Sequence, residues 1–180
     1  MLTPDQRRTL VETARQSIAA VFESRKIELA PSQFDPALRR PAGAFVTLTT
    51  PQGDLRGCIG SIAAVAPLYL AVSSSAVNAA FRDPRFQPVQ RSEFPALGLE
   101  ISVMSPLERV FDVSEIEVGR DGLIITRDPY AGLLLPQVAT EWGWDSETFL
   151  SQTCLKAGLP PDAWRLPGTR IERFSAEVFR

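Results

Sequence analysis

The sequence predicts an α+β protein with a largely antiparallel sheet flanked by helices. Apolar residues recur at helical spacing in several segments, most clearly in residues 3–24 and 67–81. Between the helical segments lie short runs of β-branched and apolar residues, and two pairs of these runs are separated only by turn-forming residues. Strands that are linked by hairpins and interleaved with helices indicate this fold class.

The opening segment predicts a helix. Thr3 can cap its first turn, Pro4 suits the first helical position, and Gln6 completes a capping-box pattern. Its apolar residues form one stripe, which predicts packing against another element: Leu10, Val11, Ala14, Ile18, Val21 and Phe22. The polar, proline-rich stretch that follows predicts a connecting loop.

The runs "AFVTLTT" and "LRGCIGSI" predict two strands of a hairpin, because "PQGD" between them supplies turn residues. Strand periodicity places Arg56, Cys58 and Gly60 on one face of the second strand and Gly57 on the other. The lone cysteine of this strand is therefore flanked by glycines and shares its face with an arginine.

The rest of the chain continues the alternation of helices and strands. A second helix over residues 67–81 must end before Pro84, and "LGLEISVMS" predicts a half-buried strand with Glu100 on its polar face. A second hairpin is expected around "RDPYAG", and two helical segments follow, the latter capped by Asp145 and stopped by Gly158. The final "TRIERFSAEVF" predicts one more strand.

Composition excludes several kinds of chemistry. The chain of 180 residues contains no histidine, which excludes Ser-His and Cys-His catalytic pairs and histidine-based metal sites. Two cysteines are too few for an ordinary structural zinc site, and no cofactor is indicated. The formal net charge is −2, and the basic residues form no stripe along the sequence. Both observations argue against nucleic acid as a partner.

The apolar runs are too short to cross a bilayer, and the N-terminal residues have no apolar signal region. A cytoplasmic location without a membrane partner is therefore expected. Reduced thiols and no disulfide are expected there.

Cys58 has two interpretations. An isolated cysteine in a strand commonly fills space as a small apolar side chain. Arg56, two residues away on the same face, would instead favour the thiolate and make the sulfur reactive. Gly57 and Gly60 indicate a close approach to the backbone, either by a ligand or by a tightly packed neighbouring helix.

Other residues could complete a site. In "AAFRDPRF", Arg82 and Arg85 could clamp an anion, or an arginine could simply pair with Asp83 in a turn fixed by proline. Glu100 could act as a base for Cys58 or fix Arg56, or it could be a solvated carboxylate. Backbone N–H groups near Gln137, at the start of a helix, could hold an anion.

Seven segments, in chain order, resemble the AMMECR domain family, also called AmmeMemoRadiSam system protein A: "FVTLTT", "LRGCIGSI", "AAFRDPRF", "LEISVMSPL", "GRDGLII", "LLPQVA" and "FLSQTCLKAGLPPDAW". The resemblance implies one AMMECR-type domain over residues 1–180. It further implies a larger lobe, approximately residues 1–106 and 161–180, a smaller lobe, approximately residues 107–160, and an interlobe cleft near "LRGCIG". No biochemical activity is firmly assigned to this family.

Two functions remain open. In the first, Cys58 is a thiolate nucleophile for a small or peptidic anionic substrate, Arg56 stabilises it or binds the substrate, and Glu100 accepts a proton. Ligand-binding residues would then be Gly57, Gly60, Arg82, Asp83, Arg85 and Gln137. In the second, the same surface is a non-catalytic adaptor module for a Memo-like or radical S-adenosylmethionine partner, which the resemblance suggests.

Overall fold

The computed structural model describes residues 1–180 and has the expected α+β architecture. The chain divides into two compact units, Met1–Met104 with Glu177–Arg180, and Ser105–Ala176. Each unit contains its own apolar core. The second unit extends past the expected residues 107–160, because strand β7 (Arg170–Phe174) pairs with two strands of its sheet.

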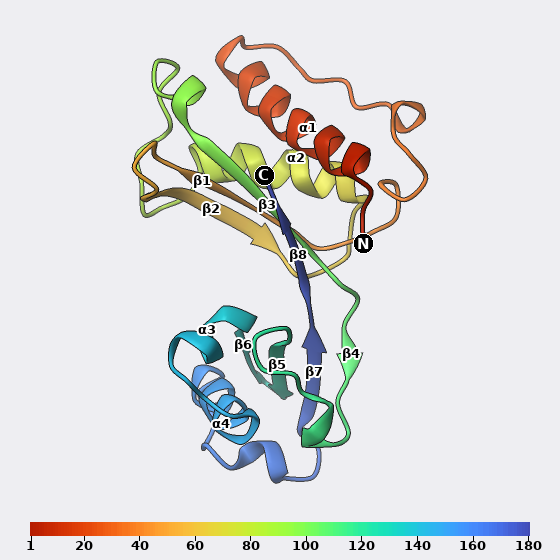
Figure 1. Ribbon diagram of the computed structural model, residues 1–180, viewed down its shortest axis with the longest axis vertical. Helices are drawn as coiled ribbons and strands as arrows, with labels where there is room; N and C mark the ends of the chain where they lie inside the picture. Colours follow the sequence, from red (N-terminus) through yellow and green to blue (C-terminus); the bar gives the residue numbers. More distant parts are fainter. The chain divides into compact units, whose positions relative to one another are not determined.

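Two long helices cover one face of the first sheet (Figure 1). Helix α1 (Pro4–Phe22) begins with the capping box of Thr3 and Gln6 that the sequence predicts. Helix α2 (Leu68–Phe81) packs against α1, and the buried hydroxyls of Ser17 and Ser73 hydrogen-bond between them at 2.8 Å. None of the helices combines the length and the apolar character that crossing a membrane requires.

The first sheet has the strand order β2-β1-β3-β8. Its strands are β1 (Ala44–Thr49), β2 (Leu55–Ser61), β3 (Gly98–Met104) and β8 (Ala176–Phe179). Strand β1 pairs antiparallel with both β2 and β3, which confirms the predicted first hairpin. Burial alternates along β1, so that one face joins the core beneath the helices and the other, with Thr47, stays half-buried.

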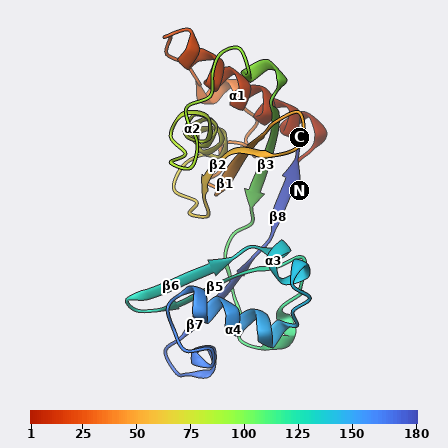
Figure 2. The ribbon, with the colours of Figure 1, turned by 90° about the vertical axis from the view of Figure 1, so that its left-hand side faces the viewer.

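The second sheet has the order β4-β7-β5-β6. Strands β5 (Gly122–Arg127) and β6 (Tyr130–Leu134) form the predicted second hairpin, and β4 (Glu108–Arg109) is a short edge strand. Helix α3 (Pro136–Glu141) is short, whereas α4 (Ser146–Lys156) lies along β5 and β6 (Figure 2). Asp145 caps α4 as expected by accepting from the Thr148 N–H at 2.8 Å.

Short 3-10 turns connect these elements at Pro31–Gln33, Phe94–Ala96, Val113–Glu115 and Ala163–Arg165. The last segment of the chain was expected to be one strand, but it is two, β7 and β8, which are separated at Ser175. Each belongs to a different sheet. Sequence periodicity detects the extended backbone of this segment but not the change of partner strands.

Gly57 tests how closely α2 packs on β2. A Cβ atom at this position would lie 2.2 Å from the carbonyl oxygen of Ala79 in α2, which is far inside van der Waals contact. We expect Gly57→Ala to lower the free energy of unfolding by about 1 to 3 kcal/mol, because the helix must move away from the strand. Urea denaturation measures the change.

The matched control for Gly57→Ala is Leu55→Ala on the same strand, where the residue is 41% exposed. This control is expected to change the free energy of unfolding by no more than about 0.5 kcal/mol. Equal effects of the two substitutions would contradict the close packing of α2 on β2.

Candidate functional site

Asp83 organises the surroundings of the motif "RGCIG". It lies two residues after the end of α2, and Pro84 prevents the helix from continuing through it. Its side chain is almost fully buried, and Oδ2 accepts the backbone N–H of Cys58 at 2.9 Å. The same carboxylate binds the Arg85 guanidinium through two hydrogen bonds, from Nε at 2.9 Å and from Nη2 at 2.7 Å. Asp83 therefore joins the loop after α2 to the edge of β2.

The charge state of this cluster follows from these bonds. The hydrogen bonds from Arg85 outweigh the effect of burial and hold the pKa of Asp83 well below its usual range. The pKa of Arg85 is raised, chiefly by its hydrogen bond to Asp83 and to a smaller extent by Cys58. Both groups therefore carry their charges across the physiological pH range.

Cys58 lies on the face of the sheet that the helices leave uncovered. It is half-buried, and the Thr47 hydroxyl of β1 lies 3.3 Å from its Sγ as a hydrogen-bond donor. Thr47 pairs with Cys58 on one side and with Glu100 of β3 on the other, so that these three residues form one row across the sheet. Sequence reasoning did not single out Thr47, since only strand pairing reveals it.

The arginine beside Cys58 is not the one that the sequence indicates. Arg56 donates from Nε and Nη2 to the Glu93 carboxylate at 3.0 and 2.8 Å, and from Nη1 to the Gln87 carbonyl. A register shift makes Arg56 the extra residue of a bulge in β2, which redirects its side chain. Instead, Arg85 binds the Cys58 carbonyl oxygen at 3.1 Å through Nη2. Arg85 is therefore the arginine that contacts the main chain of Cys58, whereas the roles expected of Arg56 stay a prediction.

Glu100 does not reach the thiol as a direct base. Its backbone is two strand spacings from Cys58, or about 10 Å, and the side chain of Thr47 lies between them. Its carboxylate accepts a hydrogen bond from Arg180 Nε at 2.9 Å and does not bind Arg56. Both roles proposed for Glu100 from the sequence are therefore unsupported by the contacts.

The two glycines of the motif make room for parts of the same chain. Gly57 faces the backbone of α2 at Ala79, and a Cβ at Gly60 would clash with Ala44 and Phe45 of β1. Of the two explanations for these glycines, close packing within the protein accounts for both. Their absent side chains are not evidence for a ligand.

The remaining candidates are not gathered around Cys58 by any hydrogen bond. Arg82 is exposed at the end of α2 and forms no ion pair. Gln137 is exposed on α3 in the second unit, and that six-residue helix has no side-chain cap. The second cysteine, Cys154, is fully buried in the core of its unit, and burial raises the pKa of its thiol.

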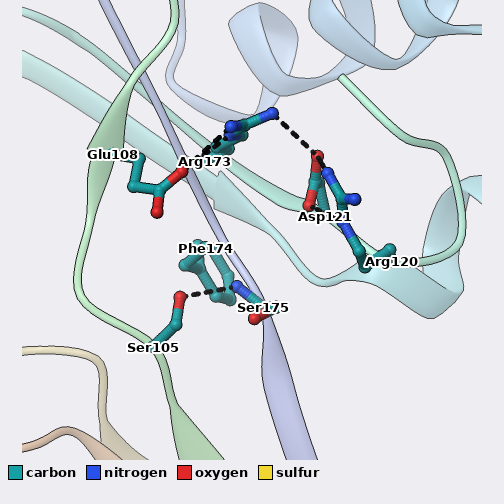
Figure 3. Close-up of a pocket in the computed structure, with 7 residues that line it drawn as sticks. All are labelled: Ser105, Glu108, Arg120, Asp121, Arg173, Phe174 and Ser175. Carbon is teal, nitrogen blue, oxygen red and sulfur yellow. Dashed lines mark hydrogen bonds and ion pairs between the residues drawn. The ribbon is translucent and has the colours of Figure 1, made fainter. Parts of the chain in front are cut away.

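The second unit contains a charged cavity of about 260 Å³ that the sequence does not indicate (Figure 3). Buried Asp121 accepts from Arg120 Nε and Nη2 at 2.8 and 3.0 Å and from the Glu117 N–H at 2.9 Å. Arg173 lies 3.8 Å from Asp121 and pairs with the Glu108 carboxylate. These bonds fix β4, β7 and the preceding turn, so that the charges of the cavity largely satisfy one another.

The pKa of Asp121 is set by burial and by its hydrogen-bond partners. Burial acts to raise its pKa, but the hydrogen bonds from Arg120 and from the Glu117 N–H outweigh burial and lower the pKa overall. In the sequence these residues are scattered from 108 to 173, and no local pattern indicates that they meet.

The fold and the site define a two-unit α+β protein with a half-buried cysteine on the exposed face of its first sheet. Comparison with known families gives the particular one. The AMMECR1 family model matches residues 11–179, and the chain belongs to this family. The resemblance seen in the sequence is thereby confirmed.

Several similar proteins come from archaea. A protein of Thermococcus gammatolerans is 46% identical over 179 residues, covering 94% of this chain and 87% of the relative. A protein of Methanothermobacter thermautotrophicus is 46% identical over 184 residues, covering 99% and 95%. The crystal structure of the uncharacterised protein PH0010 from Pyrococcus horikoshii superposes with a TM-score of 0.82 at 42% identity, covering 98% of this chain and 92% of that one. None of these names states an activity.

Asp83 is expected to stabilise the fold in a pH-dependent manner. Asp83→Asn keeps an acceptor for the Cys58 N–H but removes the charge that binds Arg85. We expect the free energy of unfolding at pH 7 to fall by about 2 to 3 kcal/mol, which is the usual contribution of hydrogen bonds to a charged group. A larger loss is not expected, because Arg85 is half-exposed and water weakens its attraction to Asp83. Urea denaturation of both proteins from pH 7 to pH 2 measures the difference.

The sign of the pH effect follows from the lowered pKa of Asp83. Its contribution is fully present above the unfolded-state pKa of about 3.9 and is lost as the pH falls toward the folded-state value. The gap between wild type and variant should therefore narrow below about pH 4. The exposed Asp5→Asn is the control. A gap that stays constant down to pH 2 would contradict the charged role of Asp83.

Proposed function

We propose that Cys58 and Arg85 form a cysteine-centred site for a small or peptidic anionic substrate, with the thiol as nucleophile and the guanidinium as the anion-binding group. The observation that carries this proposal is the double contact of Asp83. One buried carboxylate binds the backbone of Cys58 and the side chain of Arg85, and so holds a cation against the main chain of the residue that carries the half-buried thiol.

Arg85 retains hydrogen-bonding capacity for a ligand. Its Nε and Nη2 bind Asp83 and the Cys58 carbonyl, whereas Nη1 forms no hydrogen bond within the protein. The side chain is 53% exposed, so the free N–H groups are accessible from solvent. A guanidinium held on two sides and open on the third suits a carboxylate or a phosphate group.

The thiolate is the form of cysteine that acts as a nucleophile. Thr47 can donate its hydroxyl hydrogen to that thiolate. Neither the Thr47 hydroxyl nor the Arg85 guanidinium requires a histidine partner. A site of this kind is compatible with the absence of histidine from the chain.

A second function is favoured by one specific observation. No carboxylate contacts the Cys58 sulfur, whose hydrogen-bond partner is the Thr47 hydroxyl. A site without a proton acceptor at the thiol suits recognition without bond making. In this alternative the protein is an adaptor for a Memo-like or radical S-adenosylmethionine partner, and Arg85 binds an acidic group of that partner.

Alkylation kinetics test the first proposal. In the folded protein at pH 7 we expect iodoacetate and iodoacetamide to modify Cys58 and not the buried Cys154, as peptide mapping would reveal. The ratio of the two rate constants should favour the anionic reagent more than it does in the unfolded chain. Arg85→Gln should lower that ratio at least threefold, because it removes the cation that attracts iodoacetate.

Two further variants control this experiment. Arg85→Lys keeps the charge and should give an intermediate ratio, and Arg165→Gln in the second unit should leave the ratio unchanged. A Cys58 that reacts no faster than in the unfolded chain would reject the nucleophile. If the ratio nevertheless depended on Arg85, the adaptor function would be favoured.

A further inference from the structure

Strand β2 is an edge strand, and part of its edge is open. It is the outermost strand of its sheet (Figure 1). In an antiparallel pair, successive residues point their N–H and C=O groups alternately toward and away from the partner strand. The Cys58 N–H and C=O bind Asp83 and Arg85, and therefore point away from β1. By the same alternation, the N–H and C=O of Gly60 also point outward.

The two outward-pointing residues differ in what covers them. At Cys58, the carboxylate of Asp83 and the guanidinium of Arg85 act as a substitute for a neighbouring strand. Gly60 is only partly buried, and no side chain hydrogen-bonds to its backbone groups. Main-chain groups at an open sheet edge can pair with another extended chain.

An apolar groove of about 220 Å³ runs beside this open edge on the helix side of β2. Its walls are Ile59 and Gly60 of β2, the loop residues Ala63 and Val65, and a stripe of α2 that starts at Leu70. Val65 is 86% exposed and Leu70 is 38% exposed, which is unusual for large apolar side chains within one small area. A strand that was added beside Gly60 would direct alternate side chains into this groove.

The groove changes in character along α2. After Leu70 and Ala71, the stripe continues with Ser74 and Asn78, which also line the groove. Arg82, the C-cap residue directly after α2, lies beyond these lining residues at the same end. Arg82 is exposed and forms no ion pair, so it supplies an uncompensated positive charge at that end. The opposite end is apolar. This gradient complements a peptide with an apolar residue at one end and an acidic residue at the other.

We propose that the open edge of β2 and the adjoining groove bind an extended segment of a partner protein by strand addition. Gly60 exchanges main-chain hydrogen bonds with the segment, an apolar side chain of the segment packs against Val65 and Leu70, and an acidic side chain pairs with Arg82. The helix rise from Leu70 to Arg82 is about 18 Å, which an extended chain spans in five or six residues. Because only alternate residues of a strand face the groove, the apolar and acidic residues of the segment should be six positions apart.

This surface is separate from the proposed thiol site. The groove lies on the face of β2 that packs under α2, whereas the Cys58 side chain is on the opposite face with Thr47. Strand addition would therefore remain intact in Cys58→Ser. Failure of one proposal can thus be distinguished from failure of the other.

The test is a selection with the full-length chain against a displayed library of random twelve-residue peptides. We expect enriched peptides to contain an apolar residue and an Asp or Glu six positions apart. Binding of the synthetic peptides, measured by fluorescence anisotropy, should weaken at least tenfold in Leu70→Asp and in Arg82→Glu. Replacing the acidic residue of the peptide by Lys should restore binding to Arg82→Glu.

Leu155→Asp and Arg165→Glu, at exposed positions of the second unit, are matched controls. Cys58→Ser is the third control. All three variants should bind the peptides as tightly as the wild type does. Hydrogen exchange of the Gly60 amide should slow at least tenfold with bound peptide, since strand addition covers that N–H. A peptide that binds without protecting Gly60, or equally well in Leu70→Asp and Arg82→Glu, would overturn the proposal. Failure of the selection to enrich any peptide would also overturn it. The same holds if sedimentation shows that the wild-type protein is a dimer and that Leu70→Asp is a monomer.

Discussion

The buried carboxylate of Asp83 is the interaction on which the arrangement of the "RGCIG" strand depends. It binds the edge of β2 through the Cys58 N–H and the loop after α2 through Arg85. A buried charge must be neutralised and hydrogen-bonded to be tolerated, and here one arginine and two main-chain N–H groups do so. The position of Arg85 against the main chain of Cys58 is therefore a consequence of folding.

The same solution occurs in the second unit. Asp121 is buried, binds Arg120 and the main-chain N–H of Glu117, and lies close to Arg173. In both units a carboxylate that must stay charged fixes a loop to a sheet, and the arginine that neutralises it remains half in water. The two arginines differ in their capacity to bind a ligand. Arg120 has an additional acidic partner in Glu117, whereas Arg85 pairs with Asp83 alone.

Strand β2 combines these features along its length. At one end, the bulge at Arg56 and the ion pair with Glu93 attach the strand to the loop before β3. In the middle, Asp83 and Arg85 cover the main chain of Cys58, and at the other end Gly60 is uncovered beside an apolar groove. The glycines permit close packing on α2 and β1. A single strand thus carries both the proposed thiol site and the proposed peptide-binding edge, on opposite faces.

The sequence by itself determined the α+β class, both hairpins, the caps of α1 and α4 and the family, because these depend on residues that are neighbours in the chain. It also identified Cys58, Asp83 and Arg85 as candidates. Only the tertiary structure decided which arginine contacts the main chain of Cys58, because Arg56 is the extra residue of a bulge and pairs with Glu93. It alone brought Thr47 to the sulfur, assembled the Asp121 cluster and divided the last strand between two sheets, since strand pairing joins residues far apart in sequence.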